Sequence, residues 1–147
     1  MKILNKRATF DYEILDRIEA GIQLLGSEVK SLREGHGSLE GAFVRIMDSE
    51  AYLINAQIFP YEYSMPEGYD PKRTRKLLLH KNELISAKSK IDGANLTLIP
   101  ISWYTKGPRI KLEIGLARGK KQYEKREKLR REQQKRELER EYRGKVS

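Results

Sequence analysis

Cysteine and histidine, two residues often used in catalysis and metal binding, are absent or few in this chain. It contains no cysteine and only two histidines, His36 and His80, so a thiol nucleophile and a thiolate zinc site are excluded. The acidic residues Asp11, Glu19 and Glu28 fall in different segments, and no glycine-rich phosphate loop or nucleophile-elbow sequence occurs. We therefore expect no catalysis, no metal site and no cofactor.

Basic side chains are concentrated in two places, of which the first is the segment DPKRTRKLLLHK. Four cations stand there directly before an apolar strand: Lys72, Arg73, Arg75 and Lys76. Such a rim on a small β structure suits contacts with nucleic-acid phosphates. The same four residues would also suit an ordinary solvated strand end, and the segment by itself does not decide between the two.

The second basic region is the C-terminal tail. Residues 118–147 hold 13 Lys and Arg against 6 Asp and Glu, a net charge of +7, whereas residues 1–117 carry a net charge of +2. A segment of this charge attracts polyanions, and its few scattered apolar side chains do not form the face that a membrane surface requires. We expect a nucleic-acid partner, with a solvated solubility tail as the alternative.

The tail also has a pattern typical of a helix. Neither Pro nor Gly interrupts residues 120–143, and Glu precedes Lys or Arg by four residues at Glu124/Lys128, Glu127/Arg131, Glu132/Arg136, Glu139/Arg143 and Glu141/Lys145. Each pair contributes about 0.2–0.5 kcal/mol, which offsets only part of the nucleation penalty of an isolated helix. We therefore expect the tail to be disordered alone and helical on its partner, and its apolar spacing excludes a coiled coil.

The rest of the chain predicts about six short strands and two or three short helices. Strand periodicity runs from Thr9 to Leu25, and GSEVKSLREG predicts a helix capped by Ser27 and ended by Gly35. A hairpin turn is expected at residues 48–50, and a long loop at 59–73. A buried strand at 77–79 is followed by a helix up to residues 92–93, for which His80 is a cap or packing residue. A closing hairpin is expected through residues 106–108. This order predicts a mainly β fold, a small antiparallel barrel.

Two further features are compatible with RNA binding. Aromatic side chains lie in or near loops, where they could stack on unpaired bases or pack on loop backbone: Tyr61, Tyr63, Tyr69, Trp103 and Tyr104. The carboxylate of Glu19 could accept hydrogen bonds from a guanine edge or a ribose hydroxyl, or form an ion pair with a neighbouring Arg. The sequence leaves these alternatives open.

Four segments, NKRATFDYEI, EAGIQLLGSEVKSLREG, RTRKLLLHKNEL and ARGKKQYEKR, together resemble the SsrA-binding protein (small protein B) family over residues 5–126. The resemblance implies a cytoplasmic, bacterial, non-enzymatic protein with an oligonucleotide-binding-type barrel. Such a protein binds the transfer-RNA-like domain of transfer-messenger RNA (tmRNA) and delivers it to the A site of stalled ribosomes for trans-translation. It further implies a barrel domain at residues 1–119 and a basic tail at residues 120–147 that probes the empty mRNA channel near the small-subunit decoding centre. We expect a monomer that does not bind membranes.

The matched motifs imply the site residues of this chain. Those implied for RNA binding are Asn5, Lys6, Glu19, Leu78 and Lys111. Of these, Leu78 suits packing that shapes the surface, and Lys111 suits a phosphate contact. Those implied for the ribosome are the hinge Gly119, Lys120 and Lys121, then Glu124, Lys125 and Arg126, followed by the tail cations Lys128, Arg130 and Arg131. This chain departs from the family pattern at Glu124, where Asp is common, at Tyr69, which stands near a family His, and at Gln133 and Gln134, where some tails carry Trp. Two other classes remain as alternatives: an unselective RNA-binding barrel and an RNA-processing enzyme.

Overall fold

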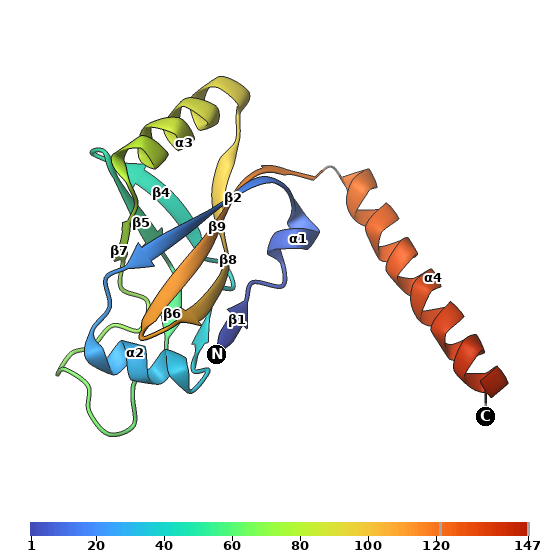
Figure 1. Ribbon diagram of the computed structural model, residues 1–147, viewed down its shortest axis with the longest axis horizontal. Coiled ribbons are helices and arrows are strands. Elements are labelled where there is room, and N and C mark those ends of the chain that lie inside the picture. Colours follow the sequence, from blue (N-terminus) through green and yellow to red (C-terminus); the bar gives the residue numbers. More distant parts are fainter. Residues whose placement is uncertain (121, 147) are drawn as a thin grey trace.

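The computed structural model describes residues 1–120 and 122–146, with the side chains of the last helix described from residue 125 to 141. In chain order the elements are β1 (Lys2–Leu4), α1 (Ala8–Asp11), β2 (Tyr12–Ile22), α2 (Gly26–Arg33), β3 (Gly37–Ser38), β4 (Phe43–Met47), β5 (Glu50–Ile54), β6 (Gln57–Ile58), β7 (Arg75–Leu78), α3 (Lys81–Ala94), β8 (Thr97–Lys106), β9 (Arg109–Gly119) and α4 (Gln122–Val146). Figure 1 shows a β structure with α3 and α2 at opposite ends, α1 at its side and α4 extending away from it.

The long strands form one closed antiparallel sheet. Their order is β8, β4, β5, β7, β2 and β9, and β9 returns to pair with β8. The short strand β1 also pairs with β8, at Ser102–Tyr104, whereas β4 pairs with β8 at Leu98. The short strands β3 and β6 pair separately. Closure satisfies the backbone groups that an open edge would leave unpaired. The prediction of a small antiparallel barrel with short helices is confirmed, and the strands beyond the expected six are two- or three-residue pieces.

Two bulges change which face of the sheet is buried. The register of β2 against β9 shifts between Ile14 and Asp16, and that of β8 against β9 shifts between Pro100 and Ser102. A bulge inserts one residue and so reverses the alternation of side chains beyond it. Ile14 consequently packs in a small outer cluster with α1, whereas Ile18 farther along β2 packs against the barrel core.

The start of β2 differs from the prediction. The alternation from Thr9 predicted a strand, but residues 8–11 form the helix α1, so that part of the prediction is wrong. Ala8 is 2% exposed and packs with Ile99 and Ala117 on the outer face of the sheet. Tertiary packing therefore decides this segment, because four residues of alternating polarity do not distinguish a strand from one helical turn.

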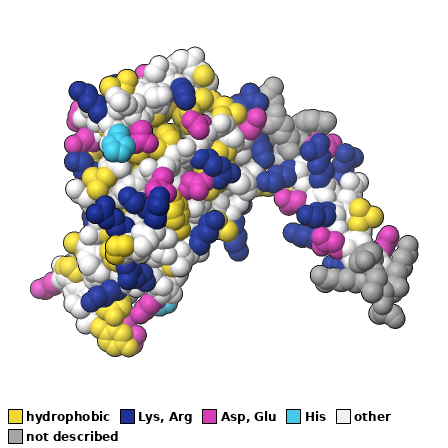
Figure 2. All heavy atoms as spheres, in the orientation of Figure 1, with side chains coloured by type: hydrophobic (Ala, Val, Ile, Leu, Met, Phe, Trp, Pro, Cys, Tyr) yellow, Lys and Arg dark blue, Asp and Glu magenta, His cyan; other side chains and the backbone are white. Residues whose placement is uncertain are grey.

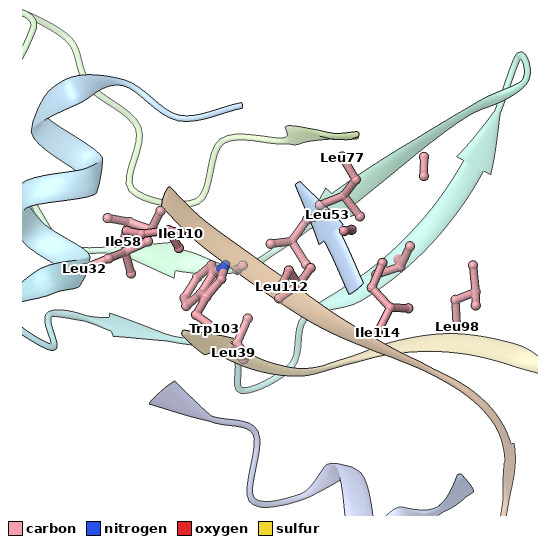
Figure 3. Packing of buried hydrophobic residues seen from close by; sticks show 14 of the residues in the cluster. Leu32, Leu39, Leu53, Ile58, Leu77, Leu98, Trp103, Ile110, Leu112 and Ile114 are labelled. Atoms are coloured by element: carbon pink, nitrogen blue, oxygen red, sulfur yellow. The ribbon is translucent and has the colours of Figure 1, made fainter. Parts of the chain in front are cut away.

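The barrel core is filled by side chains from the strands and closed by the helices. Trp103 is fully buried, as are Leu112 and Ile114 of β9, and Figure 3 shows how these side chains converge inside the sheet. Leu32 of α2 and Ala87 of α3 complete the same cluster from the two ends of the barrel. The two helices thereby hold the ends of the strands that carry the surface described below.

The predicted hairpin turns are confirmed, whereas the predicted cap of α2 is not. Asp48 and Ser49 both have positive φ, the conformation of a two-residue hairpin turn, and Gly107 (φ +60°) provides the turn between β8 and β9. Gly35 (φ +80°) follows the end of α2 as predicted, but Ser27 is not the cap, because the helix already begins at Gly26.

Other helix ends agree with the sequence more closely. His80 is the N-cap of α3, as the cap alternative predicted, and its backbone N–H donates to Oε1 of Glu83 at 3.0 Å. The helix ends at Ala94, beyond the predicted Asp92-Gly93 end, and Asn95 follows as its C-cap in the left-handed region. The chain between β6 and β7 forms the turns and irregular structure expected of a long loop.

The tail forms the helix α4, and Figure 2 shows Lys and Arg side chains at many points along it. Glu127 accepts from Arg130 at 3.0 Å and lies 3.9 Å from Nε of Arg131, one of the predicted pairs four residues apart. The helical form of the tail is therefore confirmed. Its disorder in isolation stays a prediction.

Candidate nucleic-acid interface

One row of residues crosses four neighbouring strands on the outside of the barrel. Leu78 of β7 lies opposite Gly21 of β2, Gly21 lies opposite Lys111 of β9, and Lys111 lies opposite Tyr104 of β8. Residues directly opposite one another point to the same face of a sheet. Their chain neighbours Leu77, Ala20, Leu112 and Trp103 are buried in the core. We call Leu78, Gly21, Lys111 and Tyr104 the outer row.

The glycine in the outer row lets the two strands present an apolar side chain beside a cation. A Cβ on Gly21 would lie 3.2 Å from Cβ of Leu78. Leu78 is 49% exposed and lines a shallow pocket of about 310 Å³ together with Lys111. Leu78 was expected to contribute to RNA binding by packing that shapes the surface, and its half-exposed side chain is also available to touch a ligand.

Glu19 lies two residues before Gly21 on β2, on the same face as the outer row. Its carboxylate accepts hydrogen bonds from two donors. Tyr104 donates a hydrogen bond from its hydroxyl to the Glu19 carboxylate, and Lys106 Nζ lies 2.9 Å from Oε1. The ion pair left open by the sequence is thus made with Lys106 rather than with an Arg. The hydrogen bond from Tyr104, followed by that from Lys106, lowers the pKa of Glu19 below its usual value of 4.5, and the positive charge of Lys111 acts in the same direction.

This arrangement combines the groups that RNA recognition uses. The ammonium group of Lys111 suits a phosphate, and the carboxylate of Glu19 can accept from a ribose hydroxyl or a base amino group. Leu78 offers an apolar surface on which a sugar or a base can rest. No single strand carries all three, so the barrel is what brings them together.

Arg75 is placed where it cannot contact RNA, so its predicted role as a phosphate ligand is wrong. Its side chain is fully buried, and its guanidinium donates to both Glu28 at 2.7 Å and the carbonyl oxygens of Ala56 and Pro71 at 2.8 and 2.9 Å. In the sequence, an Arg just before a leucine-rich strand suggested an exposed basic rim. The buried carboxylate of Glu28 makes it part of the interior instead.

Glu28 is the residue around which this buried network forms, a role that we did not predict from the sequence. Burial would raise its pKa, but hydrogen bonds from Arg73, the Leu25 N–H, Arg75 and Tyr69 outweigh burial and hold it below its usual 4.5. The signal was its place beside Leu32 on the inner face of a short helix, where a carboxylate needs a partner.

The network also ties the long loop to the barrel. Tyr69 donates to Oε2 of Glu28 at 2.8 Å, and burial, followed by that hydrogen bond, raises the pKa of Tyr69 to about 12. Arg73 pairs with the same carboxylate while remaining about one-third exposed. The loop is therefore anchored near residues 69–73.

The other two basic rim residues are accessible. Lys76 pairs with Oε1 of Glu50 at 2.9 Å and keeps about a third of its side chain exposed, and Lys72 is exposed on the loop. The aromatic side chains divide in the same way. Trp103 is core and Tyr69 is committed to Glu28, whereas Tyr63 is 75% exposed.

Asn5 and Lys6 lie apart from the outer row. The Asn5 side chain donates to the Pro100 carbonyl oxygen at 2.9 Å, and its backbone N–H donates to that of Ile101 at 2.7 Å. Asn5 thus fixes the turn between β1 and α1. Lys6 beside it is exposed, and its implied RNA contact stays a prediction.

The structure places the predicted tail residues as follows. Gly119 ends β9 and Lys120 follows it, with its Nζ donating to the Thr9 carbonyl oxygen. Lys121 lies outside the described residues, as does the side chain of Glu124. The remaining tail residues lie along α4, with Lys125 and Lys128 half-buried and with Arg126, Arg130 and Arg131 exposed.

Neither a metal site nor a membrane span occurs in the described part of the chain. Among its side chains, no three His, Asp or Glu residues gather in a geometry that could hold a metal ion. Among its helices, none combines the length and the apolar character needed to cross a membrane.

Comparison with known proteins places the chain in a family. The model of the family described as SmpB protein matches residues 2–144. Proteins named SsrA-binding protein are 49% identical in Sulfurihydrogenibium sp. (97% of this chain, 93% of the relative), 50% in Chlorobaculum tepidum (92% and 87%) and 49% in Aquifex aeolicus (97% and 91%). A solved structure described as "tmRNA-SmpB: a journey to the center of the bacterial ribosome" is 48% identical, with a TM-score of 0.68 over 82% of this chain and 85% of the other. The chain therefore belongs to the SmpB protein family.

Proposed function

We propose that this chain binds tmRNA and acts with it on the bacterial ribosome in trans-translation, the rescue of stalled ribosomes. Support comes from the names of its relatives, SsrA-binding protein, and from the similar solved chain described together with tmRNA and the ribosome. The observation that carries the proposal is that Leu78, Lys111 and Glu19 share one outer face, although they come from three strands distant in sequence.

The two parts of the chain divide the work. The barrel, residues 1–119, binds the transfer-RNA-like domain of tmRNA through Glu19, Leu78 and Lys111, aided by the accessible Lys6, Arg73 and Lys76. The tail, residues 120–147, lies along the empty mRNA channel beside the A site. Its net charge suits ribosomal RNA, and α4 extends away from the barrel. The protein works as a cytoplasmic adaptor that binds and delivers its RNA as a monomer, without catalysing a reaction.

The strongest competing function is an RNA-binding barrel with little selectivity, and the basic tail favours it. The two functions predict different salt behaviour, because phosphate contacts lose affinity steeply as salt rises, whereas contacts with sugars and bases depend on salt far less. We would measure binding to the transfer-RNA-like domain and to an ordinary transfer RNA at two salt concentrations, with the full chain and with residues 1–119.

The proposal expects a preference for the transfer-RNA-like domain that survives higher salt and removal of the tail. Lys111→Ala should weaken binding and reduce the salt slope by about one, whereas Lys88→Ala on the exposed face of α3 should change neither. Equal binding of both RNAs, lost with salt or with the tail, would overturn the proposed function in favour of the unselective one.

The tail has its own test in a translation system with a truncated message. Removing residues 120–147 should leave binding to the transfer-RNA-like domain nearly unchanged and abolish tagging of the nascent chain. A truncated protein that still supports tagging would show that the tail does not probe the channel.

A further inference from the structure

Lys120 and the first turns of α4 contact α1 at several points, and these contacts use ammonium groups of the kind that also bind phosphate. Nζ of Lys120 and Nζ of Lys128 each donate to the carbonyl oxygen of Thr9 at 2.7 Å. Nζ of Lys125 lies 3.2 Å from Oδ1 of Asp11. Three lysines of the tail thus converge on a single helical turn of the body.

The chemistry of α1 explains why cations gather there. A helix of one turn leaves its last carbonyl oxygens without helical partners, and these carry partial negative charge. The backbone N–H of Lys120 donates a hydrogen bond to the Asp11 carbonyl oxygen at 2.9 Å. Asp11 adds a full negative charge: burial would raise its pKa, but Lys125 and then Arg7 lower it below 3.8, so the carboxylate is ionised at neutral pH.

Phe10, between these two acceptors, contributes a third kind of contact. Nζ of Lys125 lies 5.9 Å from the centre of its ring, and the guanidinium carbon of Arg7 lies 5.8 Å from it. An aromatic ring attracts a cation near its face. Lys125 is therefore engaged by a carboxylate and by a ring at the same time.

We propose that Thr9, Phe10 and Asp11 form a seat for the base of α4. This seat sets the direction in which the tail leaves the barrel, and RNA displaces the tail lysines from it. The ion pair is partly exposed, with about a quarter of each side chain accessible, so it is weak enough to exchange. Phosphate oxygens are strong acceptors for the same lysines. Asp11 and the Thr9 carbonyl oxygen therefore bind the tail lysines until RNA phosphates replace them. Asp11 acts as a positioning residue.

The direction of the tail can be measured in the full chain, because the absence of cysteine allows clean labelling. Spin labels at Ser89→Cys on α3 and Gln133→Cys on α4 report the distance between body and tail. We expect a narrow distance distribution that Asp11→Lys broadens and that the exchange Asp11→Lys with Lys125→Asp narrows again. Asp16→Lys is the control, because Asp16 pairs with Lys90 of α3 and not with the tail.

These outcomes separate a positioning role from general damage. A misfolded Asp11→Lys variant would not be rescued by the exchange at Lys125, and the milder Asp11→Asn keeps the shape of the side chain. If the distribution is already broad without substitution, or if it stays narrow in both Asp11 variants, the seat does not hold the tail and the inference is overturned.

The competition with RNA is tested with a short RNA hairpin as the probe. Adding it should shift the distance distribution of the full chain. Asp11→Asn should bind the hairpin about 1.4- to 5-fold more tightly than Asp16→Asn, which makes the same charge change away from the tail. Equal affinities would overturn the competition. The probe contains no tmRNA sequence, so failure here leaves the proposed function standing.

Discussion

The Tyr104 hydroxyl donates a hydrogen bond to the Glu19 carboxylate across the strand that lies between them. Tyr104 belongs to β8, Glu19 to β2, and the intervening β9 carries Lys111. The bond fixes the carboxylate next to that lysine, so an acceptor and a cation are presented together at a set spacing. An exposed Glu on a strand would otherwise sample several rotamers.

The first prediction concerns that bond. Tyr104→Phe removes the hydroxyl and keeps the ring, so Glu19 is less fixed and its pKa rises toward the usual value. Affinity for tmRNA should fall about two- to tenfold, as expected for the loss of one hydrogen bond. Filter binding or calorimetry would measure it, with Tyr63→Phe on the exposed loop as the control. Unchanged affinity would show that Tyr104 does not prepare Glu19 for RNA.

Glu28 leads to a prediction about stability. Glu28→Gln removes the charge that balances Arg75, whose side chain has no access to water. Breaking one partner of a buried ion pair costs about 3–5 kcal/mol, a large share of the roughly 5–15 kcal/mol that holds a domain folded. Urea denaturation should show this loss in the free energy of unfolding. The exposed Glu62→Gln should change that free energy by no more than about 0.5 kcal/mol.

The same carboxyl predicts a pH dependence. Its pKa is lower in the folded than in the unfolded chain, where it is about 4.5, so the unfolded chain binds the proton more readily. The stability that Glu28 contributes is complete above pH 4.5 and is lost as the pH falls through the folded pKa. Melting curves from pH 7 to 3 should show a smaller loss for Glu28→Gln than for the original chain. Parallel losses would mean that another group titrates.

Two glycines predict effects of opposite sign. A Cβ on Gly37 would lie 2.6 Å from Cδ2 of Leu32 and 3.1 Å from Cζ3 of Trp103, whereas one on Gly93 of α3 meets nothing within 4 Å. Gly37→Ala should therefore destabilise the fold by about 1–3 kcal/mol, and Gly93→Ala should stabilise it by about 0.5–1 kcal/mol. Thermal melts of the two variants test the pair directly, and shifts of the same sign would contradict this packing.

The final prediction concerns the tail by itself. A peptide of residues 120–147 should be mostly unfolded in water by circular dichroism, since its pairs do not offset nucleation. In the whole chain, contacts of Lys125 and Lys128 with α1 anchor the first turns and favour the helix. A peptide with Glu127 replaced by Lys should be less helical still. A strongly helical peptide at room temperature would show that the tail needs no partner.

Much of the barrel could be predicted because its signals are local. The turn at Asp48 and Ser49, the end of α2 at Gly35 and the cap at His80 each depend on residues next to them in the chain. The helix α1 could not be predicted, because its formation depends on the packing of Ala8 against Ile99 and Ala117. Both of these residues come from the other end of the sequence.

The candidate site shows the same limit. Motif resemblance implied Glu19, Leu78 and Lys111, but their common face follows from strand register, which a single sequence does not contain. Arg75 was misassigned for a related reason: its charge suggests the surface, and only the position of Glu28 on a distant helix explains its burial. Tyr104 was noted as an aromatic residue near a loop, but its bond to Glu19 required the structure.

The closure of the barrel also has a consequence for folding. β2, at the start of the chain, pairs with β9, whose last residue Gly119 lies opposite Tyr12. Pairings so distant in sequence cost much chain entropy and slow folding. The N-terminal strands therefore cannot complete the sheet until synthesis has passed residue 119. The barrel therefore forms late and as a whole, and a chain cut short before β9 would lack Lys111 and the strand that lies between Glu19 and Tyr104.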